Sequence, residues 1–127
     1  MIKALFSSKS FLIYFFISLV AIEFLATTTT VHIELVESMW DKSNHFIAFF
    51  VLYILLSLGY QNLTLVFKVV LLFVFGLQIE IVQELSGRSP FSTLDMLADS
   101  IGILVGILTI YFFKQTKFYK SFFISSI

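Results

Sequence analysis

The sequence predicts an all-α membrane protein: a single domain over residues 1–127, built as a bundle of four transmembrane helices. Hydrophobic residues make up 59% of the chain and charged residues 13%, with a mean hydropathy of +1.02. A soluble domain is roughly half apolar and about a quarter charged. A small globular protein exposes a large share of its surface to water, so this chain is too apolar to be one. The apolar residues also gather in four runs, each near the roughly 20 residues that a helix needs to cross a bilayer.

Charge balance and cysteine content exclude further classes of protein. Eight Lys and Arg residues balance eight Asp and Glu residues, so the basic excess typical of a nucleic-acid-binding protein is missing. The chain has no cysteine, which excludes disulfides, thiolate metal sites and cysteine nucleophiles. The expected partner is therefore the lipid bilayer, with no nucleic acid.

The first predicted span covers about residues 11–26. Lys3 and Lys9 precede it, as they would in a signal peptide. Glu23 and Phe24, however, make a poor cleavage site, because such sites need small residues. We therefore expect this segment to be retained as a membrane span.

The other three spans are expected at about residues 45–61, 63–82 and 94–113. The second apolar run is short, but a helix from Asp41 onward can extend it into the interface. Residues 27–44 are then the longest predicted loop.

Turn-forming residues separate the later spans. Residues 60–62 read as a tight turn, and Gly87 and Pro90 break the helical pattern between the third and fourth spans. Ser92 or Thr93 is then expected to cap the N-terminus of the fourth helix.

The basic residues predict an orientation. With four spans, both termini and the turn at 60–62 lie on the same side. That side carries six lysines: Lys3, Lys9, Lys68, Lys114, Lys117 and Lys120. The opposite side carries only Lys42 and Arg88. Because basic residues stay in the cytoplasm, we expect both termini to be cytoplasmic, in a multi-pass protein of the bacterial cytoplasmic (inner) membrane.

The acidic residues show the complementary bias. All eight lie on the predicted outer loops or at the outer ends of spans: Glu23, Glu34, Glu37, Asp41, Glu80, Glu84, Asp95 and Asp99. Glu80 and Asp99 lie a turn or more inside apolar runs, where a charge costs roughly 2.5–3.5 kcal/mol at the helix centre and less toward the ends. Such residues normally face the bundle interior and mark function.

Helical spacing places these polar groups on single faces. Asp41 and His45 are four residues apart on the second helix. The third helix aligns Gly76, Glu80, Gln83 and Glu84, and the fourth aligns Asp95, Asp99, Gly102 and Gly106. Gly102 and Gly106 form a G-x-x-x-G pair that permits close helix packing, so this face should point inward. The predicted polar site at the outer mouth comprises Asp41, Lys42, His45, Glu80, Gln83, Arg88, Ser92, Asp95 and Asp99.

Several of these residues have a structural interpretation that stays open. Asp41 is equally well placed to be the N-cap of the second helix. His45 alone would be an interfacial histidine with satisfied hydrogen bonds. Arg88 could pair with an acid and simply hold the loop.

The ordered motifs resemble those of the VanZ-like family of small bacterial membrane proteins, over residues 41–106. The residues that carry the resemblance are Asp41-Lys42-x-x-His45-Phe46, Glu80-x-x-Gln83 and Gly87-Arg88-x-x-x-Ser92-x-x-Asp95, followed by Gly102 and Gly106. One departure is Asp99, where the family usually has Asn. The resemblance implies a role in the bacterial envelope and in susceptibility to the glycopeptide teicoplanin. It implies no settled reaction.

Four functions are compatible with these residues. The first is an envelope protein whose outward-facing polar site holds an envelope component or an amphiphilic antibiotic. The second is a membrane-embedded, metal-assisted hydrolase or transferase, since carboxylates and a histidine can hold a divalent cation; no known catalytic signature accompanies it. The third is an ion pathway, although no acid lies in the inner half of a span. The fourth is a non-catalytic partner subunit that forms oligomers. The sequence identifies no cofactor, metal or substrate.

Overall fold

The computed structural model describes residues 5, 7–27, 34–87 and 90–124, with the backbone alone for residues 25–27, 34–41 and 124. Nearly all of these residues are helical and none of them is in a strand, which confirms the all-α prediction. The elements are α2 (Ser8–Thr27), α3 (Glu34–Gly59), α4 (Leu65–Leu85), α5 (Thr93–Phe113), α6 (Lys117–Tyr119) and a short π-helix, η1 (Lys120–Ile124).

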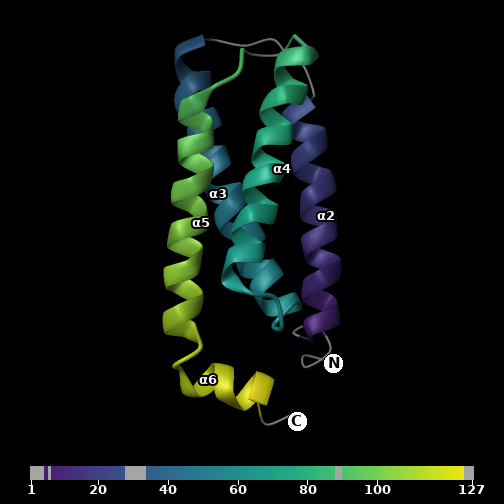
Figure 1. Ribbon diagram of the computed structural model, residues 1–127, viewed down its shortest axis with the longest axis vertical. Helices are drawn as coiled ribbons and strands as arrows, with labels where there is room; N and C mark the ends of the chain where they lie inside the picture. The colour runs from purple at the N-terminus through teal and green to yellow at the C-terminus, as the bar shows by residue number, and fades with distance from the viewer. Residues whose placement is uncertain (1–4, 6, 28–33, 88–89, 125–127) are drawn as a thin grey trace.

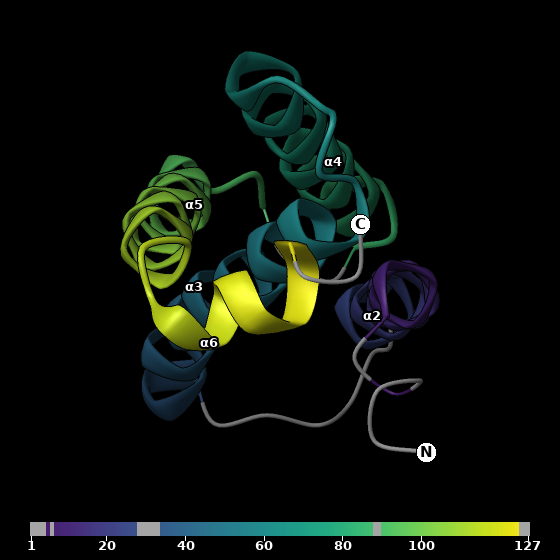
Figure 2. The ribbon, with the colours of Figure 1, turned by 90° about the horizontal axis from the view of Figure 1, so that it is seen from below.

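The four long helices lie side by side and alternate in direction (Figure 1). Seen from below, α3 lies between the other three and packs most extensively against α5 (Figure 2). The start of α2 and the end of η1 lie at the same end of the bundle, and the α4–α5 connection lies at the other (Figure 1).

Three of these helices are long and apolar enough to cross a membrane. They are the segments Lys42–Gly59, Leu65–Leu85 and Thr93–Phe113 of the described chain. These three helices support the prediction that the chain is a membrane protein. The fourth span, expected in α2, and the orientation of the bundle stay predictions.

The second helix begins earlier than expected. It starts at Glu34, before Asp41, the earliest start expected, so the prediction of a loop over residues 27–44 is wrong for residue 27 and for residues 34–44, and residues 28–33 lie outside the described part of the chain. Residues 34–58 contain no Gly or Pro, so nothing in the sequence interrupts a helix there. Asp41 consequently lies inside α3, and its interpretation as an N-cap is wrong.

The turns lie where the sequence predicts them. α3 ends at Gly59, and α4 begins after Thr64, whose hydroxyl accepts a hydrogen bond from the Phe67 N–H at 3.2 Å. Gly87 has φ +74°, a conformation that favours glycine. Ser92 caps α5, because its hydroxyl accepts from the Asp95 N–H at 3.2 Å. The cap prediction is confirmed at Ser92.

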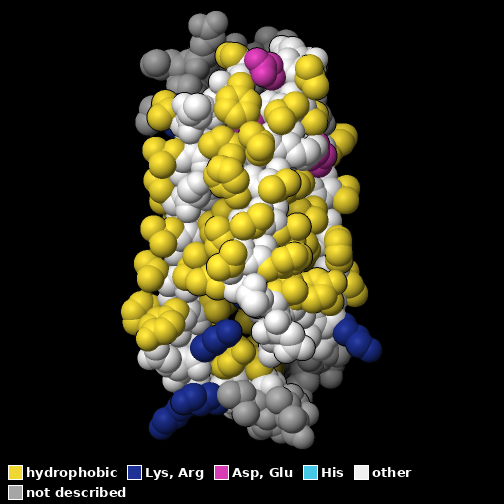
Figure 3. All heavy atoms as spheres, viewed as in Figure 1, with side chains coloured by type: hydrophobic (Ala, Val, Ile, Leu, Met, Phe, Trp, Pro, Cys, Tyr) yellow, Lys and Arg dark blue, Asp and Glu magenta, His cyan; other side chains and the backbone are white. Residues whose placement is uncertain are grey.

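Hydrophobic side chains fill the centre of the bundle and also cover its outside. The most buried apolar residues are Phe49, Leu52, Leu56, Leu72 and Ile79. Figure 3 shows apolar side chains over the middle of the outer surface, with lysines near one end and acids toward the other. Such a large exposed apolar surface suits a hydrocarbon environment rather than water.

The two glycines of the G-x-x-x-G pair bring α5 close to α3. A Cβ atom on Gly102 would clash with the Phe46 carbonyl oxygen and lie 3.1 Å from the Phe50 nitrogen. A Cβ atom on Gly106 would lie 2.9 Å from the Tyr53 ring. Both glycines therefore act in helix packing, as the sequence predicts, and they fix the height of α5 against α3.

The C-terminal helices cross beneath the bundle, from α5 toward α2 (Figure 2). Tyr119 is buried, and its ring stacks on the ring of Phe123, with 4.9 Å between the ring centroids. The centroid of the Phe123 ring in turn lies 6.0 Å from that of Phe11 in α2. No helix was predicted from the sequence in this segment.

Candidate functional site

Four ionisable side chains from three helices meet inside the bundle. His45 comes from α3, Glu80 from α4, and Asp95 and Asp99 from α5. Glu80 and Asp99 are fully buried, whereas the side chains of His45 and Asp95 keep 11% and 13% of their surface exposed. We call these four residues the polar cluster.

Asp99 forms a hydrogen bond with one nitrogen of the His45 ring. Asp99 Oδ1 lies 2.7 Å from His45 Nδ1, a short and well-formed hydrogen bond. A carboxylate in this position accepts from an Nδ1–H group, which leaves Nε2 as the ring nitrogen that points to the rest of the cluster. Asp99 therefore sets the orientation of the imidazole.

Glu80 is oriented by the start of α5. Its Oε2 atom accepts a hydrogen bond from the Ser92 backbone N–H at 2.9 Å. Its Oε1 atom lies 3.5 Å from His45 Nε2 and has no hydrogen-bond partner among the described residues. The N-cap residue of α5 thus ties the end of α4 to the polar cluster and leaves one buried oxygen directed at the histidine.

Asp95 completes the polar cluster from the first turn of α5. Its Oδ2 atom lies 3.8 Å from His45 Nε2. An acid in the first turn of a helix also interacts favourably with the helix dipole. Both Glu80 and Asp95 therefore face the same nitrogen of His45.

The polar cluster lies below the end of the bundle that carries the α4–α5 connection. Glu80 is five residues before the end of α4, or about 7.5 Å along the helix, and Asp99 is six residues after the start of α5, or about 9 Å. The described lysines Lys9, Lys114, Lys117 and Lys120 lie near the opposite end. The charge bias expected from the sequence is thus a feature of the folded chain.

The structure places the other predicted site residues less centrally. Gln83 is buried on α4, and Lys42 is half-buried near the start of the span in α3. Glu84 shares a helix face with Glu80 but is exposed in the last turn of α4, so it does not join the polar cluster. The side chain of Asp41 and the whole of Arg88 lie outside the described residues.

Two polar contacts were not anticipated. Lys68 is buried, and its Nζ atom donates to the Ser57 hydroxyl at 3.2 Å and lies 5.3 Å from the centre of the Tyr53 ring. Ser57 and Lys68 flank the turn at 60–62 in the sequence, and this position was the one feature from which their contact could have been predicted. Near the other end, Gln78 Nε2 donates to Glu23 Oε1 at 3.0 Å and links α4 to α2.

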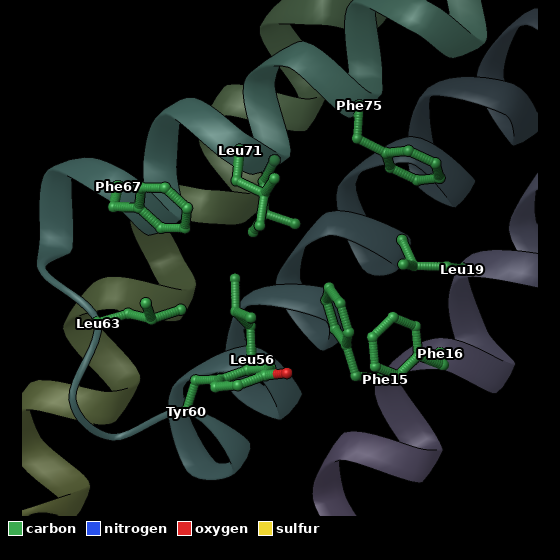
Figure 4. Close-up of a pocket in the computed structure, with 10 residues that line it drawn as sticks. Phe15, Phe16, Leu19, Leu56, Tyr60, Leu63, Phe67, Leu71 and Phe75 are labelled. Carbon is green, nitrogen blue, oxygen red and sulfur yellow. The ribbon is translucent and has the colours of Figure 1, made fainter.

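A separate groove between α2, α3 and α4 has an apolar lining (Figure 4). Its volume is about 410 Å³, and the residues that line it include Phe15, Leu56, Tyr60, Phe67 and Phe75. It contains none of the residues of the polar cluster. The groove suits hydrocarbon, whereas the polar chemistry of the described chain is concentrated in the cluster.

Comparisons of the chain with family models, with curated proteins and with solved structures found no match. What the polar cluster can do therefore rests on its own geometry. It can accept hydrogen bonds from a polar ligand, and His45 Nε2 with two carboxylate oxygens can surround a cation.

Proposed function

We propose that this chain is a multi-pass protein of the bacterial cytoplasmic membrane whose polar cluster forms an outward-facing site for a polar component of the envelope. An amphiphilic glycopeptide antibiotic such as teicoplanin is the alternative occupant, in line with the resemblance to the VanZ-like family. The observation that carries the proposal is the burial of His45, Glu80, Asp95 and Asp99 together at one end of an apolar bundle.

The cost of this arrangement supports a functional role. Charged groups within membrane spans are expensive, and those that are retained normally line a site or a pathway. The polar cluster places three carboxyl groups around one imidazole, and two of the carboxyl groups are fully buried. A single acid–histidine pair would be enough to tie α3 to α5, so the additional acids require another explanation.

The positive-inside rule supports the outward orientation. The lysines near the start of α2 and after α5 favour the cytoplasm for that end of the bundle. The α4–α5 connection and the polar cluster then face the outside. In this arrangement α2 is the fourth span, and its 20 residues make a helix about 30 Å long, which matches the hydrocarbon thickness.

The chemistry around the polar cluster suits a ligand that carries hydroxyl, amine or phosphate groups. Carboxylates accept hydrogen bonds from hydroxyl and amine groups. Lys42, at the same end of α3, and Arg88, in the chain between α4 and α5, supply positive charge for a phosphate. Envelope precursors and glycopeptides both present such groups.

The test is teicoplanin susceptibility in cells that express the chain. We expect His45→Ala and Arg88→Ala to abolish any protection while membrane abundance stays unchanged. Glu84→Gln is the matched control, because Glu84 is exposed on the same helix as Glu80. If both alanine variants keep the susceptibility of the wild type, the proposed site is wrong.

A further inference from the structure

We propose that His45, Glu80 and Asp95 bind one divalent metal ion, with Zn²⁺ the best match, and that Asp99 positions His45 for this task. Each of the three residues offers one ligand atom, and the three atoms all lie within 4.8 Å of one another. They come from three different helices, so the fold itself assembles the donor set.

The distances between the donor atoms fit an ion of this size. His45 Nε2 lies 3.5 Å from Glu80 Oε1 and 3.8 Å from Asp95 Oδ2. Ligand atoms about 2.0–2.2 Å from a tetrahedral zinc ion lie about 3.4 Å from one another. The two oxygens therefore need to approach the histidine nitrogen by at most a few tenths of an ångström, and the oxygens of Glu80 and Asp95, which lie within 4.8 Å of each other, need to approach each other by up to about 1.4 Å.

The buried oxygen of Glu80 points independently to a cation. Oε1 is inaccessible and makes no hydrogen bond to a described residue, whereas Oε2 is held by the Ser92 N–H. A buried polar atom without a partner carries the full cost of its desolvation. This oxygen is directed at His45 Nε2, so an ion between the two atoms would satisfy both of them.

The contact between Asp99 and His45 is the arrangement that metal sites commonly use around a histidine ligand. A metal-binding histidine usually donates its other ring N–H to a carboxylate, which fixes the tautomer and the ring orientation. Asp99 Oδ1, at 2.7 Å from His45 Nδ1, supplies that acceptor. Nε2 is then left with its lone pair toward Glu80 and Asp95.

The donor set also indicates which ion fits. One imidazole nitrogen and two carboxylate oxygens suit a first-row divalent metal, and the two carboxylates match its double charge. Three protein ligands leave a coordination position for water or a substrate oxygen. The partial exposure of His45 and Asp95 places this open position on their side of the site.

A bound ion would extend the proposed function without depending on it. It would act as a Lewis acid toward a phosphoryl or carbonyl oxygen of an envelope component, which favours a metal-assisted hydrolase or transferase. Zinc binding is measured without any envelope ligand. Its failure and the failure of the teicoplanin phenotype are therefore separate results.

The experiment is a calorimetric titration of Zn²⁺ into the full chain, purified in detergent and stripped with a chelator. We expect one zinc ion per chain for the wild type, and loss of this binding in His45→Ala and Glu80→Gln. Asp99→Asn should keep the stoichiometry but weaken binding roughly 10- to 100-fold, the usual effect of changing a carboxylate that holds a metal-binding histidine in place. The melting temperature of its metal-free form should match that of the metal-free wild type.

Two controls and one independent measurement complete the test. Glu84→Gln and His32→Ala should bind zinc as the wild type does, since His32 is the only other histidine in the chain. Binding of Co²⁺ to the wild type should give the visible absorption of an ion with nitrogen and oxygen ligands, which requires no variant to fold. Absence of zinc binding by the wild type, or undiminished binding by both His45→Ala and Glu80→Gln, would overturn the proposal.

Discussion

Asp99 on α5 and His45 on α3 are joined by a 2.7 Å contact between Oδ1 and Nδ1, at a depth where the surrounding helices are apolar. The contact links the two helices that pack most closely, and it aims the second ring nitrogen at Glu80 and Asp95. The orientation of one imidazole thus depends on the packing of α5 against α3. Residues that contact the Asp99 carboxylate should therefore affect the site through His45.

Gly76 provides such a case. A Cβ atom at this position would lie 2.6 Å from Asp99 Oδ2 and 3.1 Å from Phe49 Cζ, so Gly76→Ala must displace the carboxylate that orients His45. We expect zinc affinity to fall roughly 10-fold or more, because the hydrogen bond that orients His45 is disturbed. Overpacking should also lower the free energy of unfolding by about 1–3 kcal/mol. Calorimetric titration and unfolding in detergent measure the two effects.

Gly59→Ala is the matched control for this prediction. Its new Cβ atom would lie 2.6 Å from Leu12 Cδ2, between α3 and α2, and touch none of the polar cluster. It should lower stability by a similar amount and leave zinc affinity unchanged. Equal zinc affinities for Gly76→Ala and Gly59→Ala would contradict the positioning role of Asp99.

The buried contact between Lys68 and Ser57 predicts a stability effect at the other end of the bundle. Lys68 is only 5% exposed, and its ammonium group donates to the Ser57 hydroxyl at 3.2 Å. Ser57→Ala removes an acceptor from a buried charge, which should lower the free energy of unfolding by about 1–3 kcal/mol. Adding Lys68→Met should recover part of this loss, because the charge that lacks an acceptor is then gone.

Thr109→Ala is the control for the Ser57 variant. The Thr109 hydroxyl is exposed and donates only to the Val105 carbonyl oxygen of its own helix, so its removal should change little. Unfolding in detergent measures all four proteins. If Ser57→Ala is as stable as Thr109→Ala, the buried contact contributes nothing to stability.

The sequence predicted the helical class, the three apolar helices that are long enough to cross a membrane, and the inward face of α5. It could do so because apolar run length and helical spacing are local properties. The Ser92 cap was predictable for the same reason, as was the burial of Glu80 and Asp99. The start of α3 was not predictable from hydropathy, because polar residues can continue a helix beyond the apolar run.

Which carboxylate contacts which nitrogen of His45 could not be predicted from the sequence. Helical spacing defines a face of each helix, but the rotation and height of one helix against another depend on contacts such as Gly102 on the Phe46 backbone. The choice of Asp99 for Nδ1, and of Glu80 and Asp95 for Nε2, follows from those contacts. The C-terminal helices were missed because their stability comes from aromatic packing on Tyr119.

The most direct test of the outward-facing site is the accessibility of single cysteines in intact cells. The chain has no cysteine, so Ser86→Cys and Gln61→Cys each introduce a unique thiol at an exposed position, at opposite ends of the bundle. We predict that a membrane-impermeant maleimide labels Ser86→Cys at once and Gln61→Cys only after the membrane is permeabilised. Labelling of Gln61→Cys in intact cells, with Ser86→Cys protected, would contradict the account.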